Sequence, residues 1–62
     1  MKKPKVGDWI KILKMDGEPN YTGRIGKIDH IDDIDQLHGS WGGLAVNLEV
    51  DEIQIVRDPT IK

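Results

Sequence analysis

The residues best suited to chemistry lie between positions 29 and 38, where two histidines are interleaved with carboxylates. A metal site there would draw on Asp29, His30, Asp32, Asp33, Asp35 and His38. Calcium needs six to eight oxygen ligands at a defined loop spacing, which this run lacks. Zinc needs three or four ligands, and only the two histidines are spaced to face each other across a hairpin. We therefore interpret the run as a solvated turn and predict no metal and no other cofactor.

Catalysis would require a nucleophile beside a base. The hydroxyl groups outside the tyrosine belong to Thr22, Ser40 and Thr60, and no motif places one of them beside His30 or His38. His38 and Ser40 fall two apart on one predicted strand, a spacing that is common without any catalytic role. A chain of 62 residues also has little room for a deep pocket. We predict that the protein is not an enzyme.

Aromatic side chains are the candidates for a protein-binding surface, because small β-domains dock extended peptides on exposed rings. The chain has Trp9, Tyr21 and Trp41, and no phenylalanine. Trp41 shares strand parity with Leu37, so we expect it to be half-buried. We expect Trp9 and Tyr21 to be exposed and to meet. The predicted protein-binding set is therefore Trp9, Tyr21 and Trp41.

A basic face offers the alternative, a weak RNA- or DNA-binding module. Its candidate residues are Lys11, Lys14, Arg24 and Lys27. Trp9 shares a face with Lys11 on the predicted first strand, which would add a stacking platform. Against this alternative, the isoelectric point is about 5.5, and the acidic run 32–35 would repel phosphate.

Charge is distributed unevenly along the chain. Residues 1–28 carry seven basic and three acidic side chains, a net charge of +4, and residues 29–62 carry two and eight, a net charge of −6. These halves sum to the net charge of −2. Because sequence halves interleave in a closed barrel, this asymmetry does not by itself define a two-faced surface.

The composition indicates one small soluble domain. Apolar residues make up 37% of the chain and charged residues 32%, and there is no cysteine to form a disulfide or a thiolate metal site. No apolar run is long enough for a signal peptide or a membrane span, so we predict a cytoplasmic protein that does not contact a membrane. We predict a flexible N-terminal arm at residues 1–5, a domain at 6–57 and a C-terminal tail at 58–62.

Alternating apolar residues and clusters of turn residues predict five short strands. We place them at residues 9–14, 23–31, 36–41, 44–48 and 52–56, with a single 3₁₀ or helical turn at 49–51. Ile10 and Ile12 should face inward in the first strand, and Leu44, Val46 and Leu48 in the fourth. Short strands joined by glycine-rich turns favour a small all-β barrel.

The second predicted strand needs a local irregularity. Ile25 and Ile31 share parity, whereas Ile28 falls on the opposite face of a regular strand. A bulge or sharp bend near Gly26 would bring all three to one side, because glycine inside a strand often marks such a feature. Residues 32–35 then form the hairpin tip.

Two stretches resemble a known scaffold. Gly-Asp-Trp-Ile-Lys-Ile at 7–12 and Gly-Arg-Ile-Gly-Lys-Ile at 23–28 resemble the opening of SH3-like barrels of the KOW type. The acidic hairpin, followed by Gln-Leu-His-Gly-Ser-Trp, Gly-Gly-Leu-Ala-Val and Val-Asp-Glu-Ile-Gln-Ile, resembles an uncharacterised family of small SH3-like proteins. That family occurs in Gram-positive bacteria, their phages and their conjugative elements. The resemblance spans about residues 6–56.

The resemblance implies a five-stranded SH3-like barrel with a short 3₁₀ turn before the last strand, and it implies no activity. The chain departs from the family pattern after Trp41, where Gly42-Gly43 replaces an Asp-Asn-Gly-like turn and predicts a tighter one. KOW motifs bind RNA or protein, but the likeness here is to their scaffold. We predict a non-enzymatic binding or accessory module, encoded by a phage or mobile element, that contacts a protein partner as a monomer or weak homo-oligomer.

Overall fold

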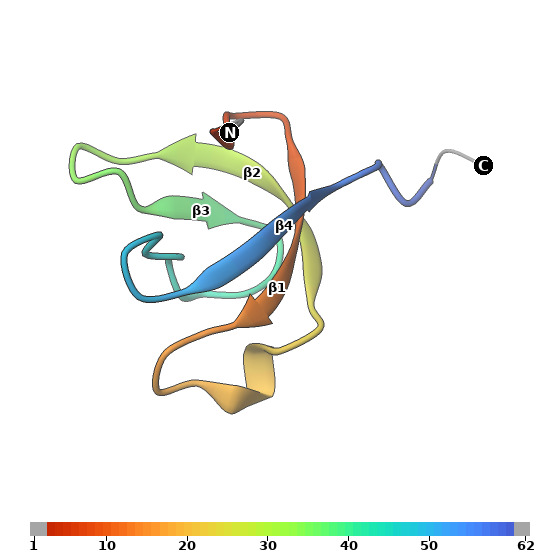
Figure 1. The fold of residues 1–62 in the computed structure, drawn as a ribbon. Helices are drawn as coiled ribbons and strands as arrows, with labels where there is room; N and C mark the ends of the chain where they lie inside the picture. The colour runs from red at the N-terminus through yellow and green to blue at the C-terminus, as the bar shows by residue number, and fades with distance from the viewer. Residues whose placement is uncertain (1–2, 61–62) are drawn as a thin grey trace.

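Residues 3–60 are described by the structure, a computed structural model, and they form an all-β domain (Figure 1). Its elements in chain order are β1 (Trp9–Lys14), the 3₁₀ helix η1 (Pro19–Tyr21), β2 (Ile25–Ile31), β3 (Leu37–Gly39) and β4 (Glu52–Val56). The strands form one antiparallel sheet in the order β3-β2-β1-β4. The predicted all-β class is confirmed, and β1 and β4 have the predicted bounds.

The inner face of the sheet carries the core. Ile10 and Ile12 are fully buried, as the alternation in β1 predicted, and they pack with Ile28 of β2 and Leu37 of β3. Met15, Trp41 and Val46 complete the buried cluster. Because the side chains of a strand alternate between its two faces, Trp9 lies with Lys11 on the outer face.

The predicted fourth strand at 44–48 is not present as a strand. Only Val46 pairs, in an isolated bridge with Leu37 that has N–H···O distances of 2.9 and 2.8 Å. Leu44 and Leu48 are exposed, so the predicted inward stripe reduces to Val46. A local side-chain contact explains the interruption: the Trp41 indole Nε1 donates to the Leu44 carbonyl, three residues later, at 2.8 Å and bends the chain just before the bridge.

The 3₁₀ helix lies elsewhere than predicted. It occupies Pro19–Tyr21 in the first loop, where proline presets the backbone for a first helical turn. Before β4, where a single 3₁₀ or helical turn was expected at 49–51, the chain makes one hydrogen-bonded turn that does not extend to a 3₁₀ helix. There the Asn47 carbonyl accepts from the amides of Val50 at 3.1 Å and Asp51 at 2.8 Å.

The irregularity of β2 falls further along than predicted. The register with β3 shifts between Ile28 and His30, while Gly26 pairs regularly with Ile10. Ile25 therefore points outward and is 45% exposed, so the expectation that it would face inward is wrong. Glycine is needed at position 26 for another reason: a Cβ there would lie 2.7 Å from the backbone nitrogen of Trp41.

Candidate functional site

The structure removes Trp41 from the predicted binding surface. Its side chain is only 3% exposed and lies in the core, more deeply than the half-burial expected from its parity with Leu37. Gly39 makes this position possible, because a Cβ at residue 39 would clash with the Trp41 ring and with the Lys27 carbonyl oxygen. A partner therefore cannot reach Trp41 in this conformation.

Trp9 and Tyr21 do not form the expected pair. Trp9 begins β1 and lies beside Lys27 of β2 and Val56 of β4. Tyr21 is the last residue of η1, and Figure 1 shows the coiled turn of η1 in the loop beyond the opposite end of β1. Trp9 is the first residue of β1 and the loop begins after the last, Lys14, so the length of β1, about 17 Å at ordinary strand rise, lies between Trp9 and the start of that loop.

Tyr21 instead contacts a residue of the rival basic set. The guanidinium carbon of Arg24 lies 4.0 Å from the centroid of the Tyr21 ring, and Arg24 Nη1 donates to the Trp41 carbonyl at 2.8 Å. Gly42 lies against both side chains and has a φ of +149°. This cluster joins the first loop to the turn after Trp41, and so Arg24 is engaged within the fold.

The other basic residues divide between two places. Lys11 and Lys27 flank Trp9 on the outer face of the sheet, since Lys27 is its cross-strand neighbour and Lys11 follows two residues later. Lys14 lies opposite Glu52, beyond a shift in the β1–β4 register. The predicted four-residue basic face is therefore reduced to Lys11 and Lys27 around one tryptophan.

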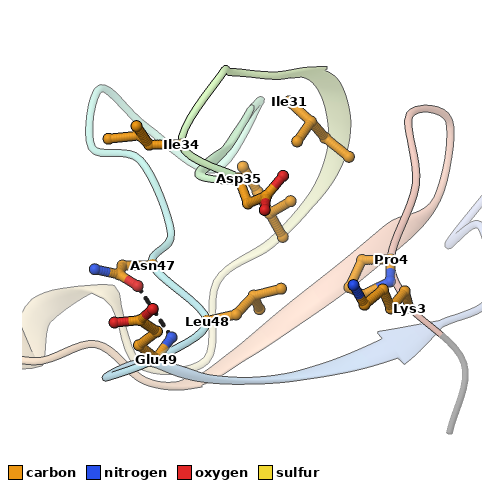
Figure 2. A pocket seen from close by; sticks show the side chains of 9 residues that line it. Lys3, Pro4, Ile31, Ile34, Asp35, Asn47, Leu48 and Glu49 are labelled. Carbon is orange, nitrogen blue, oxygen red and sulfur yellow. Dashed lines mark hydrogen bonds between the residues drawn. The ribbon is translucent and has the colours of Figure 1, made fainter.

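An open pocket of about 290 Å³ lies where three segments meet (Figure 2). The three are the N-terminal residues 3–4, the end and tip of the β2–β3 hairpin, and the turn at 47–49. Its apolar lining comprises Pro4, Ile31, Ile34, Leu37 and Leu48, and its charged lining comprises Lys3, Asp35 and Glu49. We call this site the tip groove.

Asp32 shapes the hairpin wall of the tip groove. Its Oδ1 accepts from the amides of Ile34 at 3.1 Å and Gln36 at 2.9 Å, and its Oδ2 lies 2.8 Å from His38 Nε2. The His38 hydrogen bond, followed by the Gln36 amide, holds the pKa of the Asp32 carboxyl below its ordinary value. These bonds fix the turn that leaves Ile34 73% exposed beside the groove.

Asp51 fixes the opposite wall. Its Oδ2 accepts from the Asn47 amide and its Oδ1 from the Asp16 amide, both at 2.8 Å. Asp51 is the one buried charged residue in the described part of the chain. Asp51 thereby joins two segments, the turn that carries Leu48 and the loop after β1.

The third wall is the described part of the predicted N-terminal arm. Lys5 and Asp8 close a turn, in which the Lys5 amide donates to Asp8 Oδ2 and the Asp8 amide to the Lys5 carbonyl, both at 3.0 Å. This turn places Lys3 and Pro4 against the groove. The remaining predicted terminal positions, 1–2 of the arm and 61–62 of the tail, lie outside the described residues.

Sequence reasoning did not find the tip groove. The sequence places Ile34 in a solvated turn and predicts that Leu48 faces inward on a strand. One signal was available, because an isoleucine inside an acidic turn has no partner within the turn itself. The groove depends on three segments that the fold brings together, and no local pattern records their contact.

The histidines and the hydroxyl of Ser40 bind different partners and do not form a common site. The His30 and His38 ring centroids lie 5.6 Å apart, and no group of three or more ligating side chains within residues 3–60 is arranged to hold a metal. Ser40 Oγ accepts from the Lys27 amide at 3.0 Å, and His38 faces Asp32. Over the same residues no hydrogen bond joins Ser40 to His38.

Comparisons with protein-family models, with curated proteins and with solved structures found no match to this chain. Within the part of the chain that the structure describes, no helix has the length and apolar character needed to cross a bilayer.

Proposed function

We propose that the protein is a non-enzymatic binding module, and that the tip groove takes a short extended segment of a protein partner. The observation that carries this proposal is the exposure of Ile34 and Leu48 around a pocket that buried Leu37 also lines. Exposed apolar side chains gathered at a concave site favour ligand binding over a solely structural role.

The charges around the tip groove favour a basic partner segment. Asp35 and Glu49 line it, and neither forms an ion pair with another residue of the described chain. Asp33 adds a further carboxylate at the hairpin tip, and among residues 3–60 the only lining cation is Lys3 on the N-terminal wall. The segment that fits best has one apolar side chain next to a lysine or arginine. The apolar side chain would fill the groove, and the lysine or arginine would face these carboxylates.

Replacing Leu48 by serine should weaken peptide binding at least about tenfold, since burying a leucine contributes roughly 1.5–3 kcal/mol. The probe is a short peptide with one leucine between two lysines, titrated into ¹⁵N-labelled protein and followed by amide chemical shifts. Shifts should concentrate at residues 31–35 and 47–49.

Leu13→Ser is the matched control, because Leu13 is 44% exposed and Leu48 42%, but Leu13 lies on β1 away from the groove. A second peptide, with glutamates in place of the lysines, tests the charge argument and should bind more weakly. Equal losses in both serine variants, or no shifts with the lysine peptide, would refute binding at the tip groove.

An SH3-like barrel is the scaffold that we propose for this module. The sheet order β3-β2-β1-β4, with Val46 bridged to Leu37 at the free side of β3, supports it. That bridge stands where a barrel of this type has a strand. The order of pairing therefore supports the proposal of a five-stranded barrel in which one strand is reduced to a single pair.

Weak nucleic-acid binding is a second candidate, favoured by the position of Trp9 between Lys11 and Lys27. An aromatic ring with flanking cations is the arrangement that single strands use for stacking and phosphate contact. Asp58 counts against this candidate. Hydrogen bonds from Thr60 and, to a smaller extent, the positive charge of Lys27 hold the pKa of Asp58 below its ordinary value, so Lys27 already has a carboxylate nearby.

Fluorescence titration with single-stranded and duplex DNA at low salt tests this candidate. Binding should quench Trp9, since Trp41 is buried, and Lys11→Gln with Lys27→Gln should weaken it several-fold. An unchanged signal at low salt would end the nucleic-acid hypothesis, because phosphate contacts are strongest there.

A further inference from the structure

The outer edge of β4 has no neighbouring strand within residues 3–60. β4 is the terminal strand in the order β3-β2-β1-β4, and among the named elements it contacts only β1. It runs for five residues without proline or glycine. Exposed edges of this kind are templates for pairing with another chain.

The backbone groups that face this edge follow from the register. The amide of Ile12 donates to the Arg24 carbonyl and its carbonyl accepts from Gly23, so the even residues of β1 turn toward β2. Lys11 and Trp9 therefore turn toward β4, opposite Gln54 and Val56. Because strand residues alternate, the amides and carbonyls of Ile53 and Ile55 point away from β1. No partner for them occurs within residues 3–60.

We propose that two copies of this chain form a symmetric dimer in which their β4 strands pair antiparallel about Gln54. Ile53 of each copy then lies opposite Ile55 of the other. Both have outward-facing amides and carbonyls, which is the alignment that a hydrogen-bonded antiparallel pair requires. The dimer would extend the sheet across the two-fold axis and satisfy these backbone groups.

Charge favours this occupant and this register. Glu52 lies at one end of β4 and Arg57 follows the other end, so antiparallel pairing brings the acidic end of each strand to the basic end of its partner. A register centred on Ile55 would instead place Glu52 against Asp58 of the second copy. Centring the pair on Gln54 avoids that repulsion and aligns the isoleucines on the inner face.

The pairing is independent of the tip groove. No residue of β4 lines that groove, so peptide binding and dimerisation fail or succeed separately. The contact is short and belongs with weak associations, which dissociate over the micromolar-to-millimolar range.

Sedimentation and amide hydrogen exchange, both followed from about 10 µM to about 1 mM, test the proposal. Dimer should accumulate with concentration, and exchange at Ile53 and Ile55 should slow with it. The amides of Gln54 and Val56 already face β1 and should change little. A monomer throughout, or a dimer whose Ile53 and Ile55 exchange is unaffected, would overturn the proposal.

Gln54→Lys places like charges opposite each other at the two-fold axis, and it should weaken the dimer about fivefold. Gln54→Thr is the matched control and should leave the dimer intact. A chain synthesised with an N-methyl group on Ile55 loses only an outward donor and keeps its side chain and its pairing with β1. It should remain folded, by near-ultraviolet circular dichroism, and lose the dimer; an unchanged dimer would contradict the assigned edge.

Discussion

Trp41→Ala is expected to leave most of the chain unfolded. Truncating a buried tryptophan costs about 3–5 kcal/mol, and a core of this size, without disulfide or metal, supports only about 3–5 kcal/mol of net stability. The variant also loses the indole hydrogen bond to the Leu44 carbonyl, which bends the chain into the Val46 bridge. Amide chemical-shift dispersion and urea denaturation measure the effect.

Two further variants keep this expectation testable. Trp41→Phe retains most of the ring volume but not the hydrogen bond, so it should stay folded with a loss of about 1–2 kcal/mol. Trp9→Ala should also stay folded, because Trp9 lies on the outer face of β1. A folded Trp41→Ala variant, together with an unfolded Trp9→Ala variant, would reverse the assignment of core and surface.

The parts of the fold that could be predicted from the sequence are those set by local alternation. Isoleucine recurs at every second position in β1 and in β4, and turn residues flank both strands, so their bounds and the burial of Ile10 and Ile12 could be predicted. The segment at 44–48 alternates equally well. It fails as a strand because the Trp41 side chain captures the Leu44 carbonyl, a contact that the pattern does not encode.

The binding surfaces could be predicted less well, because they depend on which segments the fold brings together. Tyr21 and Arg24 came from two rival candidate sets, yet they contact each other and serve the fold. Trp9 and Tyr21 were expected to meet, but Trp9 begins β1 and Tyr21 lies in the loop that follows its end. The tip groove has walls from three segments, one of which is the N-terminal arm.

Asp51 shows that contributions to stability, too, could not be predicted where they depend on contacts between distant segments. From the sequence it was one more acid in a turn before the last strand, whereas its carboxylate binds an amide 35 positions earlier in the chain. Charge-assisted hydrogen bonds are about twice as strong as neutral ones. A buried carboxylate that joins two loops therefore contributes far more than its neighbours.

Asp51→Ala is accordingly expected to lower the free energy of unfolding by about 2–4 kcal/mol, because it leaves the amides of Asp16 and Asn47 without their acceptor. Urea denaturation at neutral pH measures the loss. Asp51→Asn keeps one carbonyl oxygen and turns a donor toward the second amide, so it should be destabilised as well, but less than the alanine variant.

Glu52→Ala is the matched control, since Glu52 is the next residue, is exposed and carries the same charge. It should change stability by no more than about 0.5 kcal/mol. The difference between the two alanine variants isolates the two hydrogen bonds of Asp51 from any effect of net charge. Equal stabilities would show that the turn before β4 holds without its carboxylate, and the wall that presents Leu48 to the tip groove would then owe its position to packing alone.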